Sequence, residues 1–368
     1  ELYLGILPRG MSGQPLDSVP SPVGQVLATF PYFERLPLQD RATMVGLLIA
    51  TIDCLAGDDK VQAAYDRMTA HELFRVFGLS ERLVRDFIQP TLLVGLFKPP
   101  TELSALVVME LLYYYALAHV DSFDVQWIRN GTVSSSLIAP LASHLLDNYD
   151  LQLLSQSPVT QITVRNDIVT GIEYKSGGGT KSSSETTNIT DIAGVVLAVS
   201  ANGMNKIVGN SPTLAEYPLF SKAASSPSID VISVRLWLDR TVPTRTPANV
   251  FANFDSLRGA GGTFFMLDQL QDPETVWGNE IPQGSVVACD FYNAGALLSL
   301  SNSQIVDILM KDLLPSAVPK FADAQVVDAW VGKFPSSVTW FSPGSFDRRP
   351  SLETPVQNLK CAGDWVKM

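Results

Sequence analysis

The sequence has few of the residues on which hydrolytic and metal-dependent sites depend. Only three histidines and three cysteines occur among its 368 residues. It has no Gly-x-Ser-x-Gly elbow and no Gly-Lys-Ser/Thr phosphate loop, and His71-Glu72 is not followed by a second histidine at the spacing of a zinc protease. The sequence therefore offers none of the common hydrolase sites and predicts no metal site.

Clustered basic residues are also lacking, and the formal net charge is −11. Phosphate backbones are bound by clustered lysine and arginine, so nucleic acid is excluded as a partner. Cys54, Cys289 and Cys361 are odd in number and far apart, which predicts no disulfide framework and favours a reducing compartment. With 46% hydrophobic and only 17% charged residues, the composition instead favours contact with a membrane or a large apolar partner.

A third absence concerns dinucleotide binding. No strand is followed by Gly-x-Gly-x-x-Gly and a helix: the glycines at 177–179 lie in a Ser/Thr-rich stretch, and those at 259–262 precede no helical pattern. No signal or transit segment opens the chain, which starts at Glu1 as if already inside a domain. We therefore expect a truncated start, without the Gly-rich unit.

What the sequence does contain is an apolar strand that runs into Ala362-Gly363-Asp364, followed by Trp365 and Val366. A glycine directly after a buried strand lets the backbone approach a ligand, and a neighbouring carboxylate can accept hydrogen bonds from ribose or ribityl hydroxyls. This stretch is the first candidate for a cofactor-binding turn.

The segments around that turn carry a family resemblance. Lys333–Trp340, Pro343-Gly344, Arg349-Pro350 and the Pro-x-Pro run at 20–24 resemble plant-type phytoene and zeta-carotene desaturases and the related carotene isomerases, which belong to the flavin-containing amine oxidase superfamily. The resemblance implies that Gly363, with its neighbours Asp364, Trp365 and Val366, contacts FAD. In that family a further helix follows the turn, and we expect it to be missing here because the chain stops two residues after Val366.

The resemblance also implies roles for residues far from the turn. Val159, with Ile162, matches a strand whose valine backbone holds the adenine of FAD. Asn130 and Gly131 match a corner near the flavin and the substrate channel, although a simple Asn-Gly turn explains them as well. Arg349 matches an Arg-Pro segment of the desaturases on the substrate side; its alternative is a surface ion pair.

Hydrophobic periodicity predicts the elements of the fold. We expect helices at 38–55, 69–77, 80–90, 101–120, 134–146 and 303–314, with the fourth the most apolar. We expect a hairpin of strands 159–164 and 168–174, a mobile loop at 176–190, a strand at 192–199 buried on both faces, and strands at 231–240, 263–267, 286–292 and 324–333. No uninterrupted apolar run reaches the roughly 18 residues of a membrane-spanning helix, so the fourth helix is predicted to be buried in the core or to lie at a membrane surface.

These elements predict an α/β chain of mixed α+β character. An incomplete, Rossmann-like FAD-binding domain (151–205 and 355–368) is interleaved with a mixed-sheet substrate domain (1–37 and 206–354). A helical lobe at 38–150 would line the substrate channel and touch the membrane.

The resemblance implies a FAD-dependent oxidoreductase that desaturates or isomerises a carotenoid or similar apolar polyene, with hydride passing to flavin N5 and a membrane quinone reoxidising the cofactor. It implies a plastid or cyanobacterial membrane surface as the location. Two alternatives stay open: an amine oxidase, for which Trp340 and Trp365 could frame the flavin, and a non-catalytic scaffold subunit of a membrane-bound assembly. Because the Gly-rich unit is lacking, we expect the chain alone to be inactive.

Overall fold

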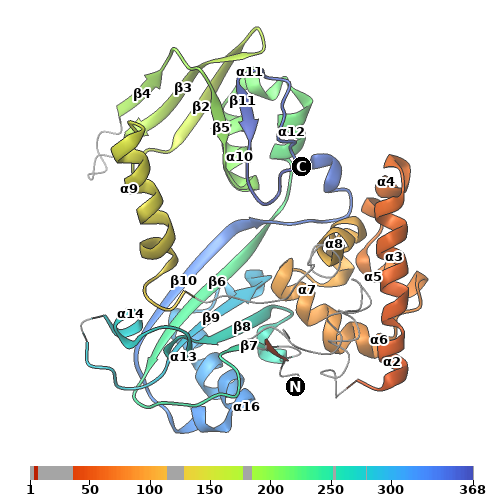
Figure 1. The fold of residues 1–368 in the computed structure, drawn as a ribbon, viewed down its shortest axis with the longest axis vertical. Helices are drawn as coiled ribbons and strands as arrows, with labels where there is room; N and C mark the ends of the chain where they lie inside the picture. Colours follow the sequence, from red (N-terminus) through yellow and green to blue (C-terminus); the bar gives the residue numbers. More distant parts are fainter. Residues whose placement is uncertain are drawn as a thin grey trace. The chain divides into compact units, whose positions relative to one another are not determined.

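The computed structural model describes residues 4–6, 36–113, 128–176, 185–251, 254–278 and 280–367. The chain forms two compact units, each made of two stretches: the first unit is Glu1–Leu141 with Ile229–Pro335, and the second is Ala142–Ser228 with Ser336–Met368. Both units contain helices and strands (Figure 1), which confirms the predicted mixed α/β class. The finer division into three domains stays a prediction.

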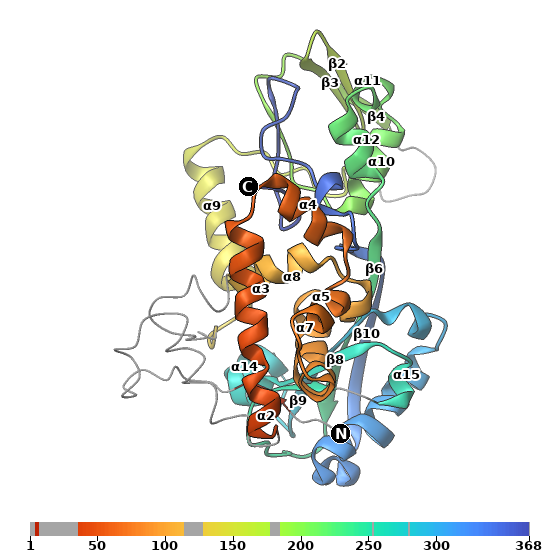
Figure 2. The same cartoon turned by 90° about the vertical axis from the view of Figure 1, so that its right-hand side faces the viewer.

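The first unit contains a series of helices between residues 38 and 112. They are α2 (Leu38–Ala42), α3 (Met44–Ala56), α4 (Asp59–Arg67), α5 (Ala70–Val76), α6 (Glu81–Leu83), the π-helical turn η2 (Val84–Ile88), α7 (Gln89–Gly95), η3 (Pro100–Glu102) and α8 (Ala105–Leu112). Thr69 and Glu72 form a reciprocal capping box on α5, and the hydroxyl of Ser80 accepts a hydrogen bond from the N–H of Leu83 at 3.1 Å. Figure 2 shows α2 and α3 following one another along nearly one line.

One predicted helix end is wrong. The helix capped by Ser80 does not stop at Gln89-Pro90 but continues as α7 to Gly95. Proline has no N–H to donate and crowds the carbonyl four residues earlier. The π-helical turn η2 lies directly before α7, so the backbone is already widened where Pro90 enters and the helix continues through it.

The most apolar predicted helix is buried. Five consecutive residues of α8, Ala105 to Met109, are at most 6% exposed. The part of the prediction that covers residues 114–120 lies outside the described residues. Within the described part of the chain, no helix is long and apolar enough to cross a membrane.

The sheet of the first unit has six strands in the order β1-β7-β8-β9-β6-β10. The strands are β1 (Leu4–Ile6), β6 (Ser228–Leu238), β7 (Ala248–Phe251), β8 (Gly261–Met266), β9 (Val286–Tyr292) and β10 (Val326–Thr339). Four of them match predicted strands, whereas β7 is too short to show an alternating pattern and was not predicted. β10 continues six residues beyond the predicted end at Lys333 and contains Pro335. It is the last strand of the order, and an edge strand tolerates a residue that cannot donate.

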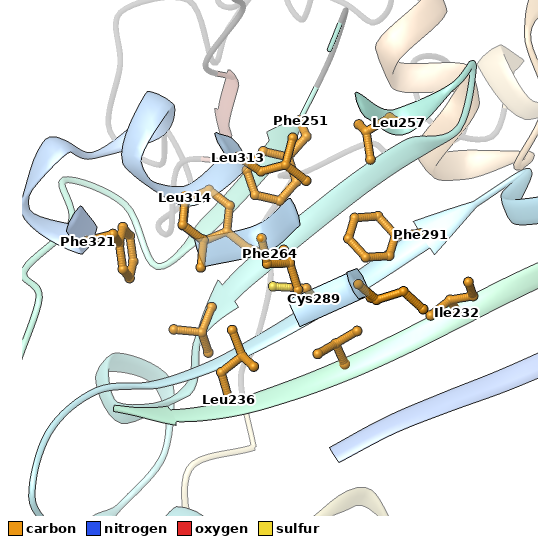
Figure 3. Packing of buried hydrophobic residues seen from close by; sticks show 14 of the residues in the cluster. Ile232, Leu236, Phe251, Leu257, Phe264, Cys289, Phe291, Leu313, Leu314 and Phe321 are labelled. Atoms are coloured by element: carbon orange, nitrogen blue, oxygen red, sulfur yellow. The ribbon is translucent and has the colours of Figure 1, made fainter. Parts of the chain in front are cut away.

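One face of this sheet carries the larger hydrophobic core. Ile232 and Leu236 of β6, Phe264 of β8 and Cys289 and Phe291 of β9 are all 0–1% exposed. Figure 3 shows them packed in one layer with residues of the following helical segment. That segment consists of α15 (Asn302–Ile308), η8 (Leu309–Leu313), α16 (Leu314–Ala317) and η9 (Pro319–Asp323). Because side chains alternate along a strand, the residues between these point to the opposite face.

Shorter elements complete the first unit, and one helix, α9, runs from the first unit into the second. They are η5 (Ser134–Ile138), α9 (Ala139–Asn148), η6 (Asp255–Leu257), α13 (Leu267–Leu270), α14 (Pro273–Trp277) and η7 (Ala294–Leu297). The predicted helix at 134–146 corresponds to η5 and α9, and again a π-helical turn precedes the helical proline, Pro140.

The second unit contains a three-stranded antiparallel sheet and a parallel pair of strands. Its elements are β2 (Val159–Arg165), β3 (Ile168–Ser176), β4 (Glu185–Ile189), β5 (Val195–Leu197), α10 (Ala201–Gly209), α11 (Pro212–Ala215), α12 (Pro218–Ala224), η10 (Phe346–Arg348) and β11 (Leu359–Cys361). The predicted hairpin is confirmed: Asn166 and Asp167 have φ of 52° and 60°, as the two central residues of a type I′ turn require.

Two predictions in this unit are wrong. The end of the stretch expected to be a loop forms β4, because its threonines pair with the edge of β3 through the main chain and need no apolar face. The strand expected to be buried on both faces is shorter, and Val196 is 63% exposed. Leu197 packs into the core beside α10 and α12, whereas no described layer covers the face that Val196 presents.

Candidate functional site

The candidate site lies where two parallel strands end together. Leu359, Lys360 and Cys361 of β11 pair with Val195, Val196 and Leu197 of β5. The pairing continues one step beyond the strands, since the N–H of Ala362 donates to the carbonyl of Leu197 at 3.0 Å. Ligands of open α/β sheets bind beyond the carboxyl ends of parallel strands. The turn at 362–366 and the chain leaving β5 both occupy that edge.

The turn is anchored by its two apolar residues and exposes the two residues before them. Trp365 and Val366 are 1% and 6% exposed, and the indole N–H of Trp365 donates to the carbonyl of Val199 at 3.0 Å. Gly363 and Asp364 are exposed. Gly363 has a φ of +136°, which side chains with a Cβ rarely adopt. The turn therefore presents a glycine backbone and a carboxylate at the edge, as the sequence predicts.

The chain that leaves β5 brings a helix N-terminus to the same edge. Ser200 follows Val199 and caps α10, accepting a hydrogen bond on its hydroxyl from the N–H of Gly203 at 3.3 Å. A Cβ on Gly203 would lie 3.1 Å from the Cβ of Val199, so the glycine allows the helix to start close to the strand end. Free N–H groups at a helix N-terminus attract anions such as phosphate. The N–H donors of α10 and the exposed carboxylate of Asp364, which can accept hydrogen bonds from sugar hydroxyls, together fit part of a dinucleotide cofactor.

Arg349 holds the turn from its C-terminal side. Its Nε donates to the carbonyl of Trp365 at 3.0 Å and a terminal nitrogen to the carbonyl of Val366 at 3.4 Å. The guanidinium also lies over the rings of Phe341 and Phe346, at 5.6 and 5.5 Å from their centres. These contacts make Arg349 a positioning residue for the turn, and its predicted place on the substrate side stays a prediction.

Val159 lies in the same unit but in the other sheet. It opens β2 opposite Tyr174 and is 40% exposed. The pairing of β2 with β3 extends to the residue before Val159, because the N–H of Lys175 donates to the carbonyl of Pro158 at 3.1 Å. Its predicted contact with adenine is not tested by this geometry.

Asn130 and Gly131 lie in the first unit, in a loop fastened to α13 and α14. The N–H of Gly131 donates to the hydroxyl of Thr275 at 3.0 Å, and its carbonyl accepts from the amide of Gln271 at 3.3 Å. The carbonyl of Asn130 accepts from the hydroxyl of Ser136 at 3.0 Å. Gly131 has a φ of +105°, so the Asn-Gly pair has a structural reason of its own, and its place beside the substrate remains a prediction.

Asn358 is the residue of this region that sequence reasoning missed. Its side chain accepts from the N–H of Val169 at 2.7 Å and donates to the carbonyls of Val169 and Ile192 at 3.1 and 3.2 Å. It thereby ties β3 and the approach to β5 to the start of β11. The sequence shows only an asparagine just before an apolar strand, and asparagine at such a position is commonly a turn residue.

The three cysteines are buried free thiols. Burial raises the pKa of Cys361, next to the turn, to about 11, and that of Cys54 to about 12. Among the described residues, no group of three or more histidine, cysteine, aspartate or glutamate side chains is placed to hold a metal ion.

The family that matches this chain is described as flavin containing amine oxidoreductase, and the match covers residues 14–368. The chain therefore belongs to the flavin-containing amine oxidoreductase family. This confirms the resemblance drawn from the turn and the segments before it.

Among curated relatives, the chain is similar to the 15-cis-phytoene desaturases of Solanum lycopersicum and Arabidopsis thaliana. Each is 22% identical over 358 residues, which cover 95% of this chain and 56% and 58% of those proteins. The chain thus spans a little over half the length of these relatives, which are named as chloroplastic or chromoplastic.

Solved structures show the same fold. A Methanosarcina mazei oxidoreductase is 14% identical with a TM-score of 0.55, over 92% of this chain and 70% of its own. Cyclohexylamine oxidase from Brevibacterium oxydans is 16% identical with a TM-score of 0.56, over 90% and 70% of the two chains.

Proposed function

We propose that this chain belongs to a FAD-dependent oxidoreductase acting on a carotenoid or similar apolar polyene. The observation that carries the proposal is the edge beyond β5 and β11, where exposed Gly363 and Asp364 lie on a turn that Trp365 and Arg349 anchor. On this proposal the Gly363 backbone and the Asp364 carboxylate contact the sugar chain of FAD. The N-terminus of α10 faces a phosphate, and the Val159 backbone meets the adenine.

The bound flavin would supply the hydride-accepting chemistry of desaturation or isomerisation. The chain's own residues have a different role, because Trp365 and Arg349 hold the turn at the cofactor edge in place. Few acid–base side chains are needed for that role. Support for a polyene comes from the likeness to phytoene desaturases along 95% of the chain.

Contact with a membrane, where an apolar substrate and a quinone acceptor dissolve, is part of the proposal. Leu38, Val45, Ile49 and Ile52 are 54–69% exposed and recur on α2 and α3 at helical spacing. Such a stripe suits a helix that lies in the membrane interface. A plastid membrane surface is the proposed location, since the plant relatives are named as chloroplastic.

An amine substrate is the second candidate, favoured by the likeness of the fold to cyclohexylamine oxidase. The pair Trp340 and Trp365 does not support it, because Trp365 is only 1% exposed and its indole is engaged with Val199. A buried ring of this kind cannot frame a ligand. A scaffold without catalysis is the third candidate, and it predicts no bound flavin.

The proposal is tested on protein expressed from its complete reading frame and purified gently. We expect flavin absorbance in the purified protein and bleaching of that absorbance under anaerobic conditions by a carotene, not by cyclohexylamine. Bleaching by the amine alone would select the second candidate. If flavin bands are absent and added FAD gives no thermal shift, both flavoenzyme candidates fail and the non-catalytic scaffold is the candidate that remains.

A further inference from the structure

The face of the six-stranded sheet opposite the hydrophobic core carries a row of polar side chains. Thr263 of β8, Asp290 of β9 and Ser233 of β6 are direct neighbours across the three central strands. The hydroxyl of Ser233 donates to Asp290 at 2.6 Å, and the hydroxyls of Thr263 and Tyr292 lie 3.0 Å apart. We call Ser233, Thr263, Asp290 and Tyr292 the polar row.

Among the described residues, the two sides of the polar row differ in exposure. Helix α7 presses on β8, since a Cβ at Gly261 would lie 2.7 Å from the Cβ of Leu93. Just beyond α7, the ring of Phe97 stacks on Tyr292 with centres 4.5 Å apart. On the β6 side Arg235 is exposed, and Ser233, Asp290 and Tyr292 all keep partial exposure. Among the described residues, the β6 side is therefore the more exposed side of the polar row.

The backbone of Phe97 supports a built site. Its φ is +63°, a conformation that non-glycine residues with bulky side chains rarely adopt. Strained residues of this kind persist where the surroundings enforce them, and they cluster at binding sites. Here the strain places the Phe97 ring flat against Tyr292 and leaves the phenol oxygen directed to Thr263.

Charge selects the kind of group that the polar row can bind. Burial raises the pKa of Asp290, only partly offset by the hydrogen bond from Ser233 and by nearby Arg235. Burial also raises the pKa of Tyr292 to about 12, so its hydroxyl stays neutral. Arg235 adds a positive charge at the more exposed side, which repels an ammonium group. The carboxyl of Asp290 already accepts the hydroxyl of Ser233, and the hydroxyls of Thr263 and Tyr292 are uncharged, so these groups suit a neutral oxygen atom.

Aromatic side chains occur on the strands beside the polar row. On the same strand and face as Ser233, two rows further along, lies Trp237, and the adjacent strand β10 exposes Trp330 and Phe334 by 51% and 43%. A molecule with a long apolar part and one oxygen would find partners for both.

We propose that the polar row binds the neutral oxygen, carbonyl or hydroxyl, of an otherwise apolar ligand. The sources of that oxygen are a quinone, the acceptor class of the proposed function, or an oxygenated polyene. The inference rests on the proposed function only for the apolar character of the ligand. The test of the polar row needs no flavin. The polar-row proposal can therefore fail while the flavin site is confirmed, and the flavin site can fail while the polar-row proposal is confirmed.

The test titrates the full chain with three apolar probes, and with cyclohexylammonium as a cationic control, while tryptophan fluorescence is followed. Trp237, on the same strand and face as Ser233, is one reporter. The probes are a benzoquinone with a short prenyl chain, a dihydroxylated carotenoid, and the hydrocarbon carotenoid of the same length. We expect one of the oxygenated probes to bind more tightly than the hydrocarbon, and its identity names the source. Equal binding of all three probes, or binding of cyclohexylammonium in preference to them, would overturn the proposal.

Two variants assign the effect to the polar row. Tyr292→Phe keeps the stacking on Phe97 and removes one hydroxyl, and Ser233→Ala removes the hydroxyl next to Asp290. Each should weaken the oxygenated probe by roughly 2- to 10-fold, the effect of one neutral hydrogen bond, and leave the hydrocarbon unchanged. Tyr217→Phe is the matched control, because its hydroxyl donates to Asp167 in the second unit. If both variants bind the oxygenated probe as the control does, the polar row is not its site.

Discussion

Gly363→Ala tests whether the exposed turn beyond β11 requires a glycine backbone. A Cβ at this position would meet Cδ1 of Trp365 at 3.5 Å, an ordinary contact distance, so steric clash contributes little. The cost comes from φ, because +136° is rarely adopted by a residue with a Cβ. Holding such a conformation costs about 1–3 kcal/mol, which corresponds to roughly 5- to 150-fold in a local opening equilibrium.

Native-state hydrogen exchange measures this local cost directly. The N–H of Ala362 is bonded to the carbonyl of Leu197, so its exchange reports opening of the turn. We expect faster exchange by that factor in Gly363→Ala. Two glycine variants serve as controls. In Gly194→Ala, where a Cβ would meet only the Asn358 carbonyl at 3.9 Å, the exchange rate of Ala362 should change little. Gly209→Ala, in open space at the end of α10, should stabilise its helix by up to about 1 kcal/mol. Exchange at Ala362 in Gly363→Ala that equals the Gly194→Ala control would refute the reasoning.

Three further predictions concern stability and reactivity. Asn358→Ala removes three side-chain hydrogen bonds and should cost about 2–4 kcal/mol in urea unfolding, and a loss below about 0.5 kcal/mol would show that water replaces them. Thr69→Ala removes the cap of α5 and should cost about 1 kcal/mol, measured as a lower urea midpoint, whereas Thr69→Ser should cost far less. Because burial raises the pKa of all three thiols, Cys54, Cys289 and Cys361 should resist iodoacetamide in native protein at pH 8 and react after denaturation. Rapid labelling of the native protein would contradict the burial. Because the thiols ionise more readily in the unfolded chain, the free energy of unfolding should not depend on them below the unfolded-state pKa near 9 and should fall as the pH rises above that value.

Much of the fold could be predicted because local signals and burial agree. The capping residues Thr69 and Ser80 start helices where the sequence places them, and the alternating runs of β6 and β9 each bury one face. The errors arise where tertiary context decides. Pro90 continues a helix because a π-helical turn precedes it, and β4 forms because the edge of β3 offers main-chain partners.

The candidate site was predictable in part for the same reason. The turn at Gly363 and Asp364 follows from a strand, a glycine and an acid in one short stretch. The side-chain hydrogen bonds of Arg349 and Asn358 join residues 16 or more positions apart, and no local sequence pattern predicts them. The polar row depends on the register of three strands, so single polar residues in apolar runs gave no sign of their neighbours.

The most direct test of the proposed flavin site is the dissociation constant for FAD in protein from the complete reading frame, compared between wild type and Asp364→Asn. The exposed carboxylate lies at the carboxyl edge of β5 and β11, where charged hydrogen bonds to cofactor hydroxyls are worth about 1.5–3 kcal/mol. We predict that FAD binding weakens about tenfold or more. Asp191→Asn, which makes the same change at an exposed position before β5, should bind as wild type does. An unchanged dissociation constant in Asp364→Asn would contradict the assignment of this edge to the flavin.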